Sequence, residues 1–161
     1  MRTLQETFVA LLRWTRGTPH RTFIVYPALL LCFEALSKRS IVPRRPMLVV
    51  LLPWGYLQYY LTGRYRAEHH AGSRGMAETS ERLLTDGPYA LSRNPMYLGH
   101  LIFLLGLALG WRSRLGWLIL LLCLPWFHQR VLRDEERLSA KFGESYTAYQ
   151  RRVRRWVPFV L

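Results

Sequence analysis

Residues Thr85–His100, TDGPYALSRNPMYLGH, combine turn formers, two tyrosines, an arginine and an asparagine at the start of an apolar run. Gly87-Pro88 and Asn94-Pro95 are two turn signals, and each proline disfavours the helical conformation in the residue before it. The stretch is therefore predicted to end in the first turn of a helix that begins near Pro95. Such a helix start presents unpaired N–H groups and a partial positive charge, which favour a bound carboxylate or phosphate.

The rest of the chain alternates between apolar runs and arginine-rich segments. Half of the 161 residues are hydrophobic, and 23 Lys+Arg against 10 Asp+Glu give a net charge of +13. In a soluble protein, that charge would predict binding to nucleic acid or to an anionic surface. Here the charges lie between the apolar runs, as they do in the loops of membrane proteins. We therefore expect one integral membrane domain over residues 1–161, with membrane lipid as a partner and no nucleic acid.

The apolar runs predict an all-α membrane bundle with about four transmembrane helices. An interfacial segment should occupy residues 1–21, with an amphipathic helix over 4–14. The predicted order of the remaining parts is two spans within 22–61, a cytosolic loop over 62–96, a helical hairpin over 97–127 and a C-terminal cytosolic helix and tail over 128–161. The hairpin helices, 97–111 and 115–127, are joined by so short a link that they must be antiparallel neighbours.

Glu34 is the one acid near the end of the first span. We expect its carboxylate to reach the lipid headgroups beside Lys38 and Arg39. The alternative is a buried acid with a function in the membrane.

The distribution of Lys and Arg predicts the orientation in the membrane. With four spans, the N-terminal segment, the 63–93 loop and the tail share one side and carry 4, 5 and 8 such residues. The two connections on the other side carry 4 and 2. The positive-inside rule then places both termini, the Thr85–His100 stretch and the C-terminal segment from Asp134 in the cytoplasm, with the chain in the inner or cytoplasmic membrane.

A second polar motif follows the hairpin, in the sequence DEERLSAKFGESYTAYQRRVRRWVP from Asp134. Helical spacing places Leu138, Phe142, Tyr146 and Tyr149 on one apolar and aromatic stripe. Projecting this stripe back by about 100° per residue brings Glu135 onto it and leaves its two acidic neighbours to the side. An acid on such a stripe needs a partner, so Glu135 is the predicted functional acid, with a purely structural pairing to Arg93 or another arginine as the alternative.

Metal chemistry is not predicted. His69 and His70 are adjacent and therefore do not share a helix face, and the remaining histidines form no metal-ligand spacing with them. Cys32 and Cys123 both lie in apolar runs, where a thiol behaves as a small hydrophobe.

The string GPYALSRNPMYLG resembles the GPYxxxRHPxYxG signature of membrane methyltransferases that include isoprenylcysteine carboxyl methyltransferase and the phospholipid N-methyltransferases. The downstream segment is similar to the EExxLxxxFGxxYxxY motif of the same family. The two matches cover roughly the second half of the chain in the family's order. The histidine that usually follows the arginine is Asn94 here, a side chain without a titratable group, and the first glutamate of the second motif is Asp134.

This resemblance implies transfer of a methyl group from S-adenosylmethionine to a lipidic or small-molecule acceptor, such as an isoprenylcysteine carboxylate, an amine or a thiol. It implies catalytic roles for Arg93 and Glu135, and no metal. Tyrosine rings from both motifs are expected to enclose the cofactor, and those of the second motif could contact its sulfonium. The predicted cofactor-binding residues are Tyr89, Asn94, Pro95, Tyr97, Leu98, Gly99, His100, Asp134, Glu135, Tyr146 and Tyr149.

Two other classes of function remain open from the sequence. Sterol reductases resemble this family in their C-terminal region, so a nicotinamide-dependent membrane reductase is one alternative. A non-enzymatic adaptor that binds anionic lipid or a partner through its arginines is the other.

Overall fold

The computed structural model describes residues 17–37, 41–69 and 82–156. These residues form helices joined by turns and irregular segments, and contain no strand, so the all-α fold class is confirmed. The interfacial helix predicted over 4–14 lies outside the described residues. The elements are α2 (Thr18–His20), the π-helix η1 (Arg21–Val25), α3 (Tyr26–Leu36), the 3₁₀ helix η2 (Pro46–Val50), α4 (Leu51–Glu68), the 3₁₀ helix η3 (Gly87–Ala90), α5 (Pro95–Trp111) and α6 (Arg114–Arg152).

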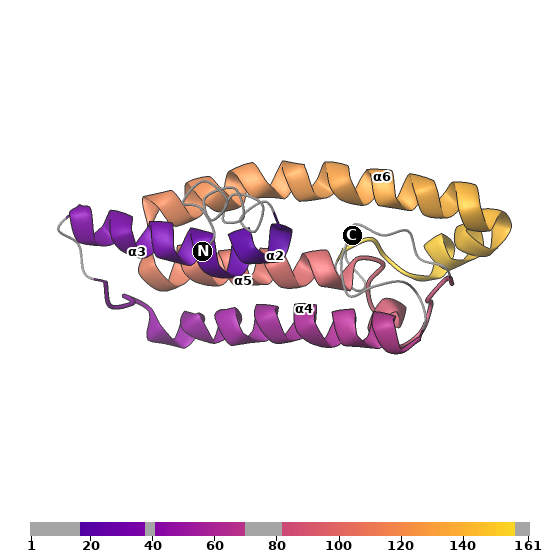
Figure 1. Ribbon diagram of the computed structural model, residues 1–161, viewed down its shortest axis with the longest axis horizontal. Helices are drawn as coiled ribbons and strands as arrows, with labels where there is room; N and C mark the ends of the chain where they lie inside the picture. The colour runs from indigo at the N-terminus through magenta and orange to yellow at the C-terminus, as the bar shows by residue number, and fades with distance from the viewer. Residues whose placement is uncertain (1–16, 38–40, 70–81, 157–161) are drawn as a thin grey trace, which may run out of the picture.

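The helices form four roughly parallel rods, with α5 at the centre (Figure 1). The first rod runs without interruption through α2, η1 and α3, and the second through η2 and α4. Helix α5 contacts α4, α6 and η1, whereas α3 contacts α6. The apolar core lies along α5, where Phe103, Leu104 and Leu107 pack with Leu30 of α3 and Phe127 of α6.

Helices α4 and α5 approach each other at two glycines. A Cβ atom added at Gly55 would lie 2.5 Å from the carbonyl oxygen of Gly99 and 2.6 Å from the backbone nitrogen of Phe103. A Cβ added at Gly99 would lie 2.7 Å from the carbonyl oxygen of Gly55. Because both contacts are with backbone atoms, the two helices can pack this closely only if neither position carries a side chain.

Helix α5 begins where the sequence predicts. Pro95 is its first residue, and Asn94 precedes it in a non-helical conformation. The helix ends at Trp111, after which Arg112 adopts a left-handed conformation with φ of 50°. Ser113 then caps α6 by accepting a hydrogen bond from the N–H of Gly116 at 3.3 Å. The short link therefore makes α5 and α6 an antiparallel pair.

The sequence predicted a C-terminal helix separate from the 97–127 hairpin, but the structure joins it to the second helix of the hairpin. Helix α6 runs from Arg114 and includes both the 115–127 segment and the second motif. The connecting residues 128–133, HQRVLR, contain no glycine or proline, so nothing in them interrupts the helical hydrogen bonds. The first part of the second motif, up to Phe142, therefore continues the second helix of the hairpin.

Helix α4 extends further than the sequence predicted: it continues beyond Leu61, the predicted end of the second span, to Glu68. This last part lacks apolar periodicity, yet Thr62, Gly63 and Arg66 are buried in it. The packed face of this part consists of small and charged residues. A search of the sequence for apolar periodicity therefore does not reveal that this part is helical and buried. Arg64 and Glu68 also form an exposed ion pair at 2.9 Å across one helical turn.

Gly143 breaks the helical course of α6. Its φ of 51° and ψ of −123° are non-helical, and the chain reverses so that residues 144–152 fold back toward η3 (Figure 1). Few L-residues adopt this conformation. Tyr146 and Tyr149 consequently pack with Tyr89 and Val153 in a second apolar cluster, separate from the main core.

Replacing Gly143 with alanine should lower the free energy of unfolding by about 1–3 kcal/mol. Added at this position, a Cβ meets no atom within 4 Å, so the effect comes from backbone strain and not from a clash. Thermal unfolding in detergent measures it. A melting temperature equal to that of the unmodified protein would show that the reversal does not depend on glycine.

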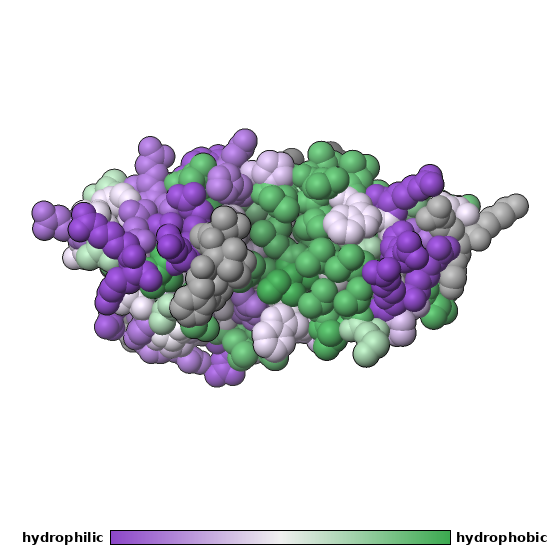
Figure 2. Space-filling model, turned by 180° about the vertical axis from the view of Figure 1, so that it is seen from behind, coloured by the Kyte–Doolittle hydropathy of each residue, from purple (hydrophilic) through white to green (hydrophobic). Residues whose placement is uncertain are grey.

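Large apolar side chains form a belt on the outer surface. Figure 2 shows hydrophobic residues in the middle region of one face, with hydrophilic residues toward both ends of the molecule. Half or more of the side chain is exposed at Leu29, Trp54, Leu57, Leu118 and Leu121. Within the described ranges, α6 is the one helix that is both long and apolar enough to cross a membrane, and α5 is apolar but shorter.

Glu34 does not reach the surface, contrary to the expectation from sequence. It is 1% exposed, and its Oε1 atom has no hydrogen-bond partner among the described residues. It lies on the face of α3 that also buries Leu30, one helical turn earlier. Its position on the inner face of α3, which the sequence pattern does not reveal, prevents its carboxylate from reaching the headgroups.

Candidate active site

The two polar motifs meet at one end of the bundle. The backbone N–H of Arg93 donates to the carbonyl oxygen of Arg154 at 2.9 Å. The Ser92 hydroxyl and the Asn94 side-chain amide both donate to the carbonyl oxygen of Arg155, each at 3.3 Å. These bonds join the loop before α5 to the segment after α6, although the two lie about sixty residues apart in sequence.

Glu135 lies at the centre of this junction and is 5% exposed. Arg155 donates to both of its carboxylate oxygens, from Nε at 3.2 Å and from Nη2 at 3.1 Å. The Asn94 amide donates to Oε1 at 3.1 Å, and Arg93 Nη1 lies 3.5 Å from Oε2. The burial expected for Glu135 from the aromatic stripe is confirmed, and its neighbour Glu136 is exposed.

The buried carboxylate of Glu135 is thus paired with two guanidinium groups. Two cations against one anion leave an excess positive charge at the junction. A buried pair is strongly destabilised when one partner is removed, because the other charge remains without compensation. Glu135 therefore holds Arg93 and Arg155 in place, and both oxygens are already used in doing so.

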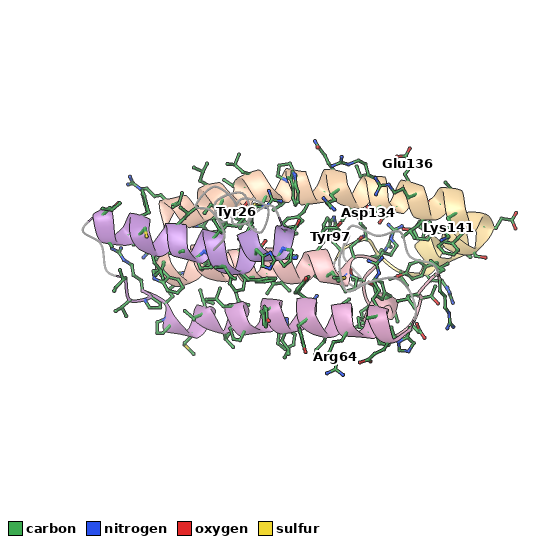
Figure 3. All side chains as sticks on the ribbon, in the orientation of Figure 1. Tyr26, Arg64, Tyr97, Asp134, Glu136 and Lys141 are labelled. Atoms are coloured by element: carbon green, nitrogen blue, oxygen red, sulfur yellow. The ribbon has the colours of Figure 1, made fainter. Side chains whose placement is uncertain are left out.

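Asp134 forms a separate group with residues of α5 and α6. Its Oδ2 accepts a hydrogen bond from the Tyr97 hydroxyl at 2.6 Å, and its Oδ1 lies 3.5 Å from Arg137 Nη1. Arg130 Nε in turn donates to the Tyr97 hydroxyl oxygen at 3.1 Å. Figure 3 shows Tyr97 and Asp134 close together between α5 and α6. These contacts fix the position of Asp134 relative to the start of α5.

Three tyrosines form an aromatic wall at the same end. The Tyr149 hydroxyl donates to the carbonyl oxygen of Tyr89 at 2.7 Å, and the Tyr146 and Tyr149 ring centroids lie 5.9 Å apart. Burial raises the pKa of Tyr89 to about 12. Its phenol therefore stays neutral near pH 7 and can supply an apolar ring and a hydroxyl but not a base.

A pocket opens between these groups. It combines four arginines, one acid, three tyrosines of the aromatic wall and several apolar side chains. Arg93 lines it, and the Nε atom of Arg93 is buried and has no hydrogen-bond partner in the described part of the chain. The lining residues are Arg66, Arg82, Leu83, Leu84, Tyr89, Arg93, Asn94, Pro95, Met96, Tyr97, Asp134, Arg137, Leu138, Tyr146 and Tyr149.

Some predicted cofactor-binding residues lie away from this lining. Glu135 lies behind Arg93 and Asn94, and Leu98 and Gly99 are further along α5, with Gly99 against α4. His100 is completely buried, with its ring 4.7 Å from that of Phe23 and 4.8 Å from that of Tyr59. Neither nitrogen of its ring has a hydrogen-bond partner within the described segments.

Several arginines of the site were not identified from the sequence. Arg155 belongs to the basic QRRVRRW segment of the predicted cytosolic tail, and it contacts Glu135. Arg130 and Arg137 flank the acidic triplet on α6 and contact Tyr97 and Asp134. Helical spacing could have indicated these two, because side chains three or four positions from Asp134 on a helix lie beside it.

Known proteins resemble this chain in the region that contains the first motif and the start of the second. A family model described as phospholipid methyltransferase matches residues 54–145. The protein-S-isoprenylcysteine O-methyltransferase of Schizosaccharomyces pombe is 35% identical over 79 residues, which are 48% of this chain and 34% of that protein. Protein-S-isoprenylcysteine O-methyltransferase B of Arabidopsis thaliana is 32% identical over 97 residues, which are 59% and 43% of the two chains.

A third relative is named for a different role. The cobalt-zinc-cadmium resistance protein CzcN of Cupriavidus metallidurans is 33% identical over 76 residues, 47% of this chain and 35% of that protein. The matched region therefore spans less than half the length of each of these three relatives. No solved structure matches the chain. Because the family model covers more than half of the sequence, the chain belongs to the phospholipid methyltransferase family.

Proposed function

We propose that this chain transfers a methyl group from S-adenosylmethionine to a lipidic or other small acceptor that resides in the membrane. The observation that carries the proposal is the pocket between the two motifs, which Arg93 and Asp134 both line. The matched family and the two isoprenylcysteine O-methyltransferase relatives support this class of reaction.

The chemistry of the pocket fits a donor that carries a carboxylate, an ammonium, a sulfonium and an aromatic base. The buried Nε of Arg93 lacks an acceptor among described residues, and a donor carboxylate would supply one. Asp134 is the acid that lines the pocket and could pair with the ammonium or the ribose hydroxyls. The rings of Tyr89, Tyr146 and Tyr149 provide apolar faces for the base and for the sulfonium.

Glu135 has a different role in this proposal. Its oxygens accept hydrogen bonds from Arg155 and Asn94 and lie beside Arg93, so it is a positioning residue for these side chains. The bound donor supplies an electrophilic methyl group. The chain aligns the acceptor with that methyl group and excludes water, which methyl transfer by in-line displacement requires. Arg93 and Arg66 are placed to orient an anionic acceptor or donor group at the pocket.

We also propose that the four rods are four membrane spans, with the two motifs on the cytoplasmic side. The exposed apolar belt on α3, α4 and α6 supports contact with lipid. The polar end that holds the pocket carries most of the Lys and Arg residues, as the positive-inside rule requires of cytoplasmic segments. The pocket would then open beside the headgroups, where a membrane acceptor can reach it.

Substitution of Arg93 by glutamine should weaken binding of S-adenosylhomocysteine by about 10- to 100-fold, the loss expected for one or two charge-assisted hydrogen bonds. Isothermal titration of the purified protein in detergent measures the affinity. Arg152→Gln, which removes an exposed arginine near the end of α6, is the matched control and should bind normally.

The same titration with NADPH tests the reductase alternative. The proposal expects binding of S-adenosylhomocysteine and none of NADPH. If Arg93→Gln and Arg152→Gln bind S-adenosylhomocysteine equally well, or if NADPH binds in preference, the proposed donor site is wrong.

A further inference from the structure

A second cavity lies between the first rod and α6. Tyr26, labelled in Figure 3, lies between α3 and α6, and its hydroxyl oxygen is 3.8 Å from Cys123 Sγ. Among the described residues that line this cavity, Arg21 is the one with a permanent charge. None of the lining residues belongs to the pocket at the two motifs. The lining residues are Thr18, Arg21, Thr22, Tyr26, Leu122, Cys123, Trp126 and Phe127.

Arg21 has an unused hydrogen-bond donor. Its Nε atom is buried and has no partner among the residues that the structure describes. Its guanidinium carbon lies 5.1 Å from the centroid of the Trp126 ring, and that of Arg130 lies 5.7 Å from the centroid of the same ring. A buried donor without an acceptor is unfavourable, so an anion beside Arg21 would relieve the desolvation of Nε.

The local backbone is unusual at this position. Arg21 is the first residue of the π-helical turn η1, and such turns occur mostly as single insertions in α-helices, frequently at functional sites. The hydroxyl of Thr22 donates to the carbonyl oxygen of Thr18 at 3.1 Å. The polar wall of the cavity is therefore formed by a helix segment whose ordinary hydrogen-bond pattern is altered.

The cavity lies at a level that suits lipid headgroups. No Lys, Arg, Asp or Glu occurs on α6 between Arg114 and Arg130. These two residues are about 24 Å apart along the helix axis, at about 1.5 Å per residue, which approaches the hydrocarbon thickness of about 30 Å. Trp126, close to Arg130, is a residue type enriched at this boundary.

An apolar surface continues from the cavity toward the middle of the molecule. Leu122 lines the cavity and is 65% exposed, and Leu118 and Leu121 on α6 are also exposed. On the facing rod, Ile24 is 49% exposed. A free phosphate ion would use Arg21 but would leave this surface uncovered, whereas the chains of a lipid would cover it.

We propose that this cavity binds the phosphate group of a membrane glycerophospholipid. Arg21 donates to a phosphate oxygen through Nε, and the acyl chains lie along the exposed apolar side chains of α6. The site is separate from the donor pocket and does not depend on the proposed methyl transfer. Because Arg130 stacks on Trp126 and also donates to Tyr97, the bound lipid would lie next to the arginine that holds the Tyr97 hydroxyl.

Thermal unfolding in detergent with added phosphatidylglycerol tests this site. The lipid should raise the melting temperature of the unmodified protein by about 5 °C at a large excess over its dissociation constant. Arg21→Gln should lose most of this shift, because the cation and the Nε donor are both removed. Arg114→Gln, an exposed arginine at the other end of the α6 span, is the matched control and should keep the shift.

Two further ligands identify the source of the phosphate. Diacylglycerol, which has no phosphate, and inorganic phosphate, which has no acyl chains, should each produce little or no shift. Arg21→Lys keeps the charge but lacks the Nε donor, and should retain a partial shift with phosphatidylglycerol.

Several results would overturn the proposal. A shift that is unchanged in Arg21→Gln, or that is lost equally in Arg114→Gln, would exclude Arg21 as the binding residue. An equal shift with diacylglycerol would exclude phosphate recognition, and an equal shift with inorganic phosphate would exclude a lipid site. If Arg21→Gln is not monodisperse and helical, the Arg21→Lys variant decides: a full shift contradicts the proposed Nε contact, and a partial one supports it.

Discussion

Replacement of Glu135 with alanine is expected to produce the largest loss at the site, lowering the free energy of unfolding by about 3–5 kcal/mol. The change leaves the guanidinium groups of Arg93 and Arg155 beside each other with no anion between them. It also removes the acceptor of the Asn94 amide. The loop before α5 should then separate from the segment after α6, and binding of S-adenosylhomocysteine should fall below detection.

The matched control is Glu136→Ala, which removes the neighbouring acid from the exposed side of the same helix. It should change the melting temperature and the affinity only slightly. Thermal unfolding and isothermal titration of both variants provide the comparison. Equal effects of the two substitutions would mean that the pairing of Glu135 with the two arginines does not hold the site together.

Replacement of Gly55 with alanine should lower the free energy of unfolding by about 3 kcal/mol, at the upper end of the usual range for overpacking. The new Cβ would have to occupy the space of the Gly99 carbonyl oxygen and the Phe103 nitrogen, so α4 and α5 must separate. Side chains can often rotate away from a new methyl group, but backbone atoms of a packed helix cannot. The melting temperature should fall by roughly 6–12 °C.

Gly110→Ala is the control for this prediction because Gly110 lies on α5 and faces the same rod, at Val49 of η2. There the new Cβ would be 3.2 Å from a terminal methyl group of Val49, which can move slightly. Alanine is also the better helix former, by about 1 kcal/mol, so this variant should be close to neutral or somewhat more stable. If Gly55→Ala is as stable as Gly110→Ala, the close approach of α4 and α5 is incorrect.

The sequence predicted those features that depend on local pattern. The start of α5 follows from Asn94-Pro95, since a proline is favoured in the first turn and disfavours helix in its predecessor. Glu135 is buried, as the predicted stripe required. The helix breaks at Gly143, however, so Tyr146 and Tyr149 reach the site through the reversal of the chain and not along that stripe.

Features that depend on tertiary packing were not predictable in the same way. The buried face of α4 near Thr62 and Arg66 contains small and charged residues, and their burial depends on what packs against them. The contact of Arg155 with Glu135 requires the chain to reverse at Gly143 and return to the loop before α5. A run of arginines alone does not reveal which one turns inward.

The different environments of the two acids of the second motif were also not predictable from the sequence. Asp134 was expected to the side of the stripe, and it faces the pocket with the Tyr97 hydroxyl as its partner. Glu135, expected to act at the site, is enclosed behind Arg93 and Asn94. We therefore assign donor contact to Asp134 and the positioning of arginines to Glu135 in the proposed mechanism.

In the proposed function, both motifs form one pocket for the methyl donor. Ultraviolet cross-linking of radiolabelled S-adenosylmethionine to the purified protein, followed by peptide mapping, tests it most directly. We expect label on peptides of both motifs, from the region of Tyr89 and Tyr97 and from the region of Tyr146 and Tyr149. Excess S-adenosylhomocysteine should remove both labels. Label confined to one motif, or to residues outside the pocket, would contradict it.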